Sequence, residues 1–170
     1  MPAYVALLRA VNVGGTGKLP MTELKALCQE AGFQDVQTYI ASGNVVFRST
    51  LGEKAARSAL ETRLQAHMGK PVQVFIRTAE EMAGVLERNP FSREPGNRVA
   101  VLFTDAPLPA DPTIGITGQK TEQLALGKRE LFIFYPDGMG TSRLRLPAEK
   151  TGTARNINTV AKLADMADAL

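Results

Sequence analysis

Apolar residues along the chain occur in short continuous runs and in one-sided helical spacings, which predicts strands and helices in turn. Residues 3–8 form a continuous apolar run of the kind found in buried strands. A helix is predicted next, with Pro20 suited to its first turn and Gly32 to its C-terminal stop. Its apolar face follows the i, i+3, i+4, i+7 spacing and consists of Leu24, Leu27, Cys28 and Ala31.

The same patterns continue to residue 76. They predict strands at 36–41 and 45–48 joined by a tight Ser42-Gly43-Asn44 hairpin, a helix from about 53 to 68, and a strand at 72–76. The order β-α-β-β-α-β is the split pattern of a ferredoxin-like unit. We therefore expect an antiparallel sheet with the first and third strands adjacent at its centre and both helices on one face.

The remaining sequence predicts a second α+β half. Thr78 and Glu81 have the spacing of a capping box, which opens a helix to about Arg88. A strand at 99–103, a hairpin of 123–126 with 130–135, and a final amphipathic helix follow. The fold class is thus α+β, with a ferredoxin-like half at 1–77 and a second half at 78–170 packed on it as one compact globule.

Composition and charge limit the function classes. The chain has 170 residues, 44% of them hydrophobic, and 20 basic against 17 acidic residues, a net charge of +3 that helps attract anions without implying nucleic acid. The single cysteine, Cys28, excludes an internal disulfide and a four-cysteine zinc site, and its place on an apolar helix face indicates packing rather than reactivity. The first apolar run ends at Arg9, too early for a signal or membrane helix. We expect a cytoplasmic protein with no membrane contact and no metal or other cofactor.

The first candidate site is the turn that follows the first strand. It contains a cation, an amide, glycines and a lysine, namely Arg9, Asn12, Gly14, Gly15 and Lys18. Free backbone N–H groups at such a turn can bind an anion. The turn matches neither the Walker loop nor the dinucleotide fingerprint. The alternative is a flexible turn with Arg9 in a surface ion pair.

The expected sheet topology brings the Ser42–Asn44 hairpin next to the turn that follows the first strand. In the expected sheet, the first and second strands end at one rim, so the loop at 9–18 and the Ser42–Asn44 hairpin should meet. Ser42 and Asn44 are therefore candidate ligand-binding residues with Arg9.

Thr153-Ala154-Arg155-Asn156 forms a second cluster just before the final helix. Asn156 can cap that helix, and Arg155 beside a helix N-terminus suits phosphate or carboxylate. Alternatively, Arg155 pairs with Asp137 or Glu149. Whether Arg155 and Asn156 join the rim around Arg9 is open at the sequence level. Asp137 lies in a predicted turn and is the best-placed single carboxylate for chemistry.

Several motifs occur in order along the chain: Leu8–Gly15 with Lys18, Tyr39–Phe47, Asn89–Phe91, Glu130–Gly138, Ser142–Leu144 and Thr153–Val160. Together they resemble the domain-of-unknown-function 1697 family of bacterial proteins. The resemblance implies a compact α+β protein with ferredoxin-like architecture, and it implies no activity. Ile157 departs from the pattern, since such proteins usually carry Trp there.

We expect the protein to bind a phosphate-bearing or other anionic ligand, a nucleotide or nucleic acid, at the rim formed by the Arg9–Lys18 loop and the Ser42–Asn44 hairpin. Base-stacking RNA recognition is disfavoured because residues 44–49 lack the aromatic-rich strand motif of RNA-recognition modules. One alternative is a small metal-independent enzyme for an anionic metabolite, with Arg9 and Arg155 orienting it and Asp137 or Lys18 transferring a proton. Another is a structural or partner-binding protein.

Overall fold

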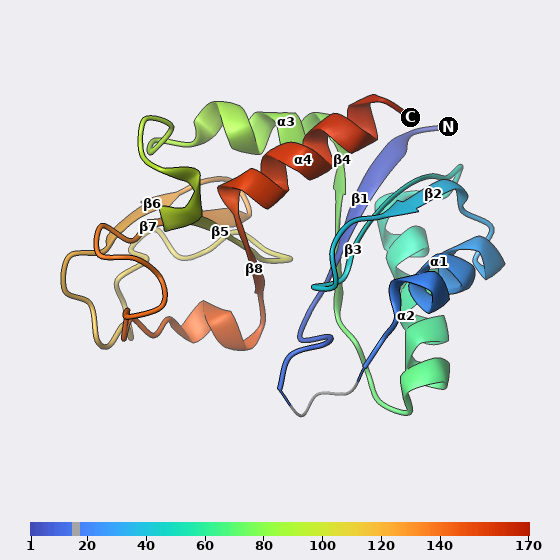
Figure 1. Ribbon diagram of the computed structural model, residues 1–170, viewed down its shortest axis with the longest axis horizontal. Helices are drawn as coiled ribbons and strands as arrows, with labels where there is room; N and C mark the ends of the chain where they lie inside the picture. The colour runs from blue at the N-terminus through green and yellow to red at the C-terminus, as the bar shows by residue number, and fades with distance from the viewer. Residues whose placement is uncertain (15–17) are drawn as a thin grey trace. The chain divides into compact units, whose positions relative to one another are not determined.

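A computed structural model describes residues 1–14 and 18–170, and in this part of the chain it contains two four-stranded antiparallel sheets and four α-helices (Figure 1). The chain divides into two units: residues 1–83 with 162–170, and residues 84–161. Each sheet lies within one unit. The α+β class predicted from the sequence is confirmed, whereas the packing of the two halves on one another stays a prediction.

The first unit has the predicted β-α-β-β-α-β order. Its elements are β1 (Ala3–Leu8), α1 (Met21–Glu30), β2 (Gln34–Thr38), β3 (Asn44–Arg48), α2 (Glu53–Met68) and β4 (Val74–Thr78). The strand order is β2-β3-β1-β4, so β1 and β3 are adjacent at the centre, as expected. This topology is compatible with the ferredoxin-like unit that the sequence pattern predicted.

The side chains of β1 point alternately to the two faces of the sheet, and those on one face form part of the core of the first unit. Tyr4, Ala6 and Leu8 point to one face of the sheet and belong to the same apolar cluster as the inner residues of α1 and α2. Figure 1 shows both helices on that face. Cys28 is fully buried in this cluster, and burial raises the pKa of its thiol to about 12, as expected for a packing residue.

The second unit contains the other sheet, with strand order β6-β7-β5-β8. Its strands are β5 (Val99–Phe103), β6 (Gln123–Leu126), β7 (Glu130–Phe134) and β8 (Thr153–Asn156). Short 3-10 helices occur at Gly96–Arg98 and Pro147–Lys150. The helices α3 (Ala79–Arg88) and α4 (Ile157–Asp168) each contribute residues to both units.

Two predicted helix caps are confirmed by hydrogen bonds. The Glu81 N–H donates to Thr78 Oγ1 at 3.1 Å, and the Thr78 N–H donates to Glu81 Oε1 at 2.9 Å, which together form the capping box of α3. The Thr159 N–H donates to Asn156 Oδ1 at 2.9 Å at the start of α4.

The β2–β3 connection differs from the predicted tight hairpin. The sequence placed the first strand of the pair at 36–41, whereas β2 ends at Thr38 and the connection runs over residues 39–43. Positive φ angles at Ile40 (+50°) and Gly43 (+87°) interrupt the extended backbone. Asn44, assigned to the turn, is instead the first residue of β3.

Residues 153–156 were predicted to be a polar segment before the final helix, and they form β8 instead. This strand pairs with β5, with Arg155 opposite Val101. Its side chains alternate, since Thr153 and Arg155 are buried while Ala154 and Asn156 are exposed. The pairing with β5 lies more than fifty residues away in sequence, so the local pattern did not reveal it.

No helix in the described ranges combines the length and the apolar character needed to span a bilayer.

Candidate functional site

The end of β1 is hydrogen-bonded to a neighbouring connection on each side. The Leu8 backbone N–H donates to Gly43 O at 2.8 Å, on the β2–β3 connection. The Arg9 backbone N–H donates to Gln73 O at 3.0 Å, on the connection from α2 to β4. Arg9 therefore leaves the sheet between these two connections.

The Asn12 side chain fixes the loop that follows β1. Its Oδ1 accepts the Leu19 N–H at 2.6 Å and its Nδ2 donates to Leu19 O at 2.9 Å, which closes the loop. Nδ2 also donates to Ala41 O at 2.7 Å, on the β2–β3 connection. The structure thus brings together the two segments that the sequence expected to meet, and the amide of Asn12 is bonded to their backbone groups.

Ser42 and Asn44 stabilise the other segment of this rim. Asn44 is fully buried, and its Nδ2 donates to Tyr39 O at 2.9 Å and to Ser42 Oγ at 2.8 Å. The Tyr39 N–H donates to Asn44 O at 2.9 Å. These bonds fold the connection back on itself, so Asn44 lies beneath the rim surface and Ser42 is half-buried at it.

The backbone after β1 has an unusual alternation. Ala10, Asn12 and Gly14 have positive φ angles of +56°, +56° and +51°, and the residues between them do not. Backbone N–H groups in a turn of this kind can line a concavity that suits an anion. A positive φ is uncommon for alanine and costs energy, and strain of this kind often accompanies function. Gly15 lies outside the described residues, and Lys18 is exposed.

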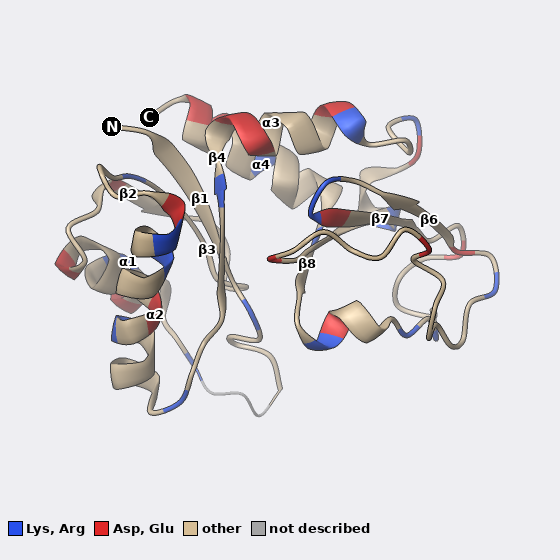
Figure 2. Ribbon diagram, turned by 180° about the vertical axis from the view of Figure 1, so that it is seen from behind, with Lys and Arg blue, Asp and Glu red and all other residues tan. Residues whose placement is uncertain are grey.

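Arg9 borders a hollow of about 280 Å³ in the first unit. It is lined by Arg9, Ala10, Lys70, Pro71, Val72 and Gln73. Figure 2 shows basic positions both where β1 ends and on the α2–β4 connection. The sequence reasoning missed Lys70. The pairing of β1 with β4, which sets Leu8 opposite Val74, was the signal that places this connection beside Arg9.

Arg155 and Asn156 lie in the second unit, and their joining the rim around Arg9 stays a prediction. Arg155 is 8% exposed; its Nη1 donates to Thr153 Oγ1 at 2.6 Å and to Ala154 O at 2.9 Å. Burial lowers the pKa of its guanidinium to about 10, which still leaves it cationic at neutral pH.

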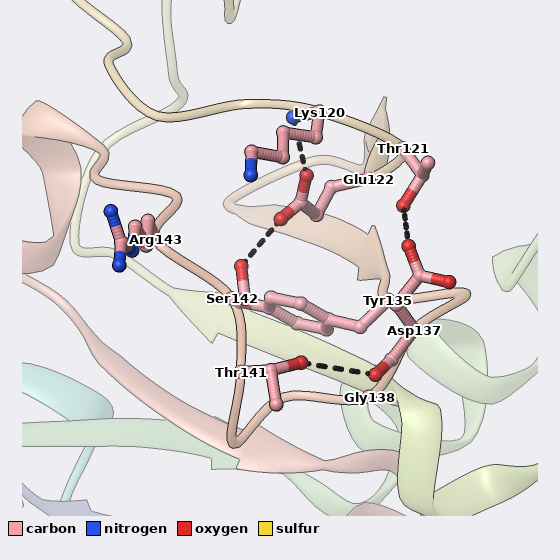
Figure 3. Close-up of a pocket in the computed structure, with 9 residues that line it drawn as sticks. All are labelled: Lys120, Thr121, Glu122, Tyr135, Asp137, Gly138, Thr141, Ser142 and Arg143. Atoms are coloured by element: carbon pink, nitrogen blue, oxygen red, sulfur yellow. Dashed lines mark hydrogen bonds between the residues drawn. The ribbon is translucent and has the colours of Figure 1, made fainter.

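The second unit contains a hollow of its own, of about 210 Å³, beside the β6–β7 hairpin (Figure 3). It is lined by Lys120, Thr121, Glu122, Tyr135, Asp137, Gly138, Thr141, Ser142 and Arg143. The Gly138 N–H donates to Tyr135 O at 3.0 Å, which confirms the predicted turn. Asp137, singled out from the sequence, thus lies among several polar groups.

Glu122 is the buried carboxylate of this hollow. Its Oε2 accepts a hydrogen bond from Ser142 Oγ at 2.5 Å, and its Oε1 accepts the Lys120 N–H at 2.7 Å. These hydrogen bonds, that from Ser142 foremost, lower the pKa of Glu122. Glu122 is therefore an anion at neutral pH and a weak general base.

Tyr135 and Asp137 complete the polar lining. Burial, reinforced by the carboxylates of Glu149 and Glu122, raises the pKa of Tyr135 to about 12, so its phenol is neutral. Thr121 Oγ1 donates to Asp137 Oδ2 at 2.6 Å.

The sequence reasoning missed Glu122 and Ser142. Glu122 could have been found from the predicted hairpin, because pairing of Gln123 with Phe134 sets Glu122 next to Tyr135. Ser142 follows an irregular turn, and no local pattern indicated its contact. Within the described ranges, no three His, Cys, Asp or Glu residues gather in a way that would hold a metal ion.

Comparisons with known proteins agree with this description of the fold. The model of a family described as "Protein of unknown function (DUF1697)" matches residues 1–132. The solved structure of the conserved bacterial protein SP0830 from Streptococcus pneumoniae is similar, with a TM-score of 0.81 and 27% sequence identity. The match covers 97% of this chain and 98% of that one. None of the curated proteins matches the chain.

Proposed function

The chain belongs to the DUF1697 family, and because that family is described as being of unknown function, we propose a function from the chain's own geometry. It binds a phosphate-bearing or other anionic ligand at the hollow bordered by Arg9 and Lys70. A nucleotide is the ligand class that we favour. The observation that carries this proposal is the placement of two cationic side chains on one hollow beside the loop at 9–14.

The cationic side chains and the backbone of the loop both favour an anionic ligand. Hydrogen bonds from cationic side chains to phosphate are among the strongest in proteins. Ala10 also lines the hollow, and its positive φ belongs to a turn whose backbone N–H groups can bind an anion. Asn12 and Asn44 serve as supports, because their amides fix the loop and the neighbouring connection.

The size of the hollow favours a small ligand. At about 280 Å³ it is near the lower end of ordinary ligand sites, which suits a phosphate with a nucleoside or similar small group attached. Acidic and basic positions are interspersed along α1 and α2 (Figure 2), so these helices present no continuous basic face to a nucleic acid.

The sheet also argues against RNA recognition by base stacking. RNA-recognition modules stack bases on the sheet face opposite their helices. In this protein the residues of that face, among them Val5, Leu7 and Phe75, are fully buried. This leaves the rim as the supported place for a phosphate group. Within this proposal the protein works in the cytoplasm, which its single buried cysteine supports.

The test is the affinity of the protein for ADP and for inorganic phosphate, measured by calorimetry. Arg9→Ala and Lys70→Ala should each weaken ADP binding by roughly ten- to a hundredfold, because each removes a charge-assisted hydrogen bond worth about 1.5–3 kcal/mol. Thermal unfolding should change little, since exposed ion pairs contribute about 0–1 kcal/mol.

Lys25→Ala is the matched control, because Lys25 is an exposed lysine on α1 away from the hollow lining. It removes the same charge from the same unit and should leave the affinity unchanged. If all three variants bind ADP equally well, the proposal fails. If instead a single-stranded oligonucleotide binds more tightly than ADP and with a steep salt dependence, the ligand is a nucleic acid.

A further inference from the structure

We propose that the hollow beside the β6–β7 hairpin is a second binding site, specific for a small zwitterion that carries one ammonium and one carboxylate group. The site lies wholly in the second unit and does not depend on the proposed function of the first. The ligand class follows from which charged groups on the lining have partners and where they lie.

Two cations on the lining are available to a ligand. The Lys120 ammonium and the Arg143 guanidinium make no hydrogen bond or ion pair with any residue that the structure describes. Both side chains are exposed, so they reach a ligand without first breaking a contact. A guanidinium binds a carboxylate through two parallel hydrogen bonds.

A negative charge, the Asp137 carboxylate, lies on the side of the hollow across from the two cations. Asp137 Oδ2 is bonded to Thr121, while its Oδ1 has no partner among the residues at 1–14 and 18–170. Figure 3 shows Lys120 and Arg143 on one side of the hollow and Asp137 on the other, with the Tyr135 ring between them. A ligand with its carboxylate toward Arg143 and its ammonium toward Asp137 would lie across that ring.

The balance of charges selects against simpler ions. Glu122 is held as an anion by Ser142, and with Asp137 it balances the two cations on the lining. A plain anion would meet two carboxylates, and a plain cation would meet Lys120 and Arg143. Only a ligand with both charges satisfies both ends, and the volume of about 210 Å³ limits it to a molecule smaller than a typical drug.

A series of amino acids with increasing chain length tests this site. Glycine, β-alanine, γ-aminobutyrate and ε-aminocaproate are titrated into the full chain and followed by NMR or calorimetry, with butylamine and butyrate as single-charge probes. We expect one length to bind best, and to bind roughly tenfold or more tightly than either single-charge probe, because each end contributes a charged hydrogen bond.

Variants on the two sides of the hollow separate what the ammonium and the carboxylate of the ligand each contribute to the affinity. Asp137→Asn should reduce the affinity for the best amino acid to that of butyrate. Arg143→Gln together with Lys120→Gln, which removes both cations of the lining, should reduce it to that of butylamine. Lys128→Gln, an exposed lysine of the same hairpin outside the lining, is the matched control and should have no effect. Thermal unfolding checks that each variant is folded.

Three results would overturn the proposal. Butyrate binding as tightly as the amino acids would make this a plain anion site, and equal binding of butylamine would make it a cation site. Absence of binding for every member of the series, with the variants folded, would leave the hollow without this function.

Discussion

The hydrogen-bond partners of each charged side chain decide whether it can also bind a ligand. Glu122 and Asp137 line the same hollow, yet the Glu122 carboxylate accepts hydrogen bonds at both oxygens, while the Asp137 carboxylate accepts one through Oδ2 alone among the described residues. Glu122 therefore sets the electrostatic environment, and Asp137 is the carboxylate that a ligand can reach.

The Ser142 hydroxyl should control the titration of Glu122. Removing it with Ser142→Ala should move the pKa of Glu122 back up toward its ordinary value, because the hydrogen bond from Ser142 is the main cause of its lowering. A carboxyl group with a lowered pKa in the folded state stabilises the fold above its unfolded pKa, and this stabilisation is lost as the pH falls through the folded pKa. The variant should therefore lose less stability on acidification.

Carboxyl NMR titration measures this directly and contains its own control. Asp111 also has a lowered pKa, caused by hydrogen bonds from Thr113, and its titration should be the same in the variant. An unchanged Glu122 titration in Ser142→Ala would contradict the assigned cause.

At the scale of elements, the rim depends on the close approach of two connections. A Cβ atom on Gly43 would lie 2.6 Å from Val11 Cγ2 and 2.9 Å from Leu8 Cβ, and Gly43 has a φ of +87°. Glycine is thus required at this position for both its backbone angle and its lack of a side chain.

Gly43→Ala should destabilise the protein by more than Gly32→Ala. Gly32 has a φ of +86° with no atom within 4 Å of an added Cβ. Gly32→Ala therefore destabilises the folded state through the strained backbone angle alone. The close contacts at Gly43 should add about 1–3 kcal/mol, the usual cost of overpacking. Chemical denaturation of both variants gives the difference, and equal losses would show that the two connections are not tightly packed.

Elements that local sequence patterns form could be predicted, whereas elements that depend on contacts distant in sequence could not. The sequence predicted the bounds of β1, α2 and β5 correctly, because apolar runs and helix spacing are local signals. It missed β8, whose four residues are mostly polar and are ordered by pairing with β5. It placed Asn44 in a turn, because the hydrogen bonds that fold this connection are invisible in composition.

At the scale of the whole molecule, the candidate sites come from the topology of each unit. The central position of β1 brings Arg9 beside Gln73 and Lys70, which are about sixty residues away in sequence. The Arg9 turn was recognisable from sequence, whereas Lys70 became a candidate only through the β1–β4 register. The likeness to the pneumococcal protein covers nearly all of both chains, so it extends to residues of both units.

The proposed anion site lies where β1 ends. The most direct measurement is an NMR titration of the nitrogen-labelled protein with ADP, following every assigned backbone amide. We expect the largest saturable shifts at residues 9–14 and 69–73, and we expect Lys70→Ala to weaken ADP binding while Lys25→Ala leaves it unchanged. Saturable shifts confined to other residues, or no shifts at any concentration of ADP or phosphate, would contradict it.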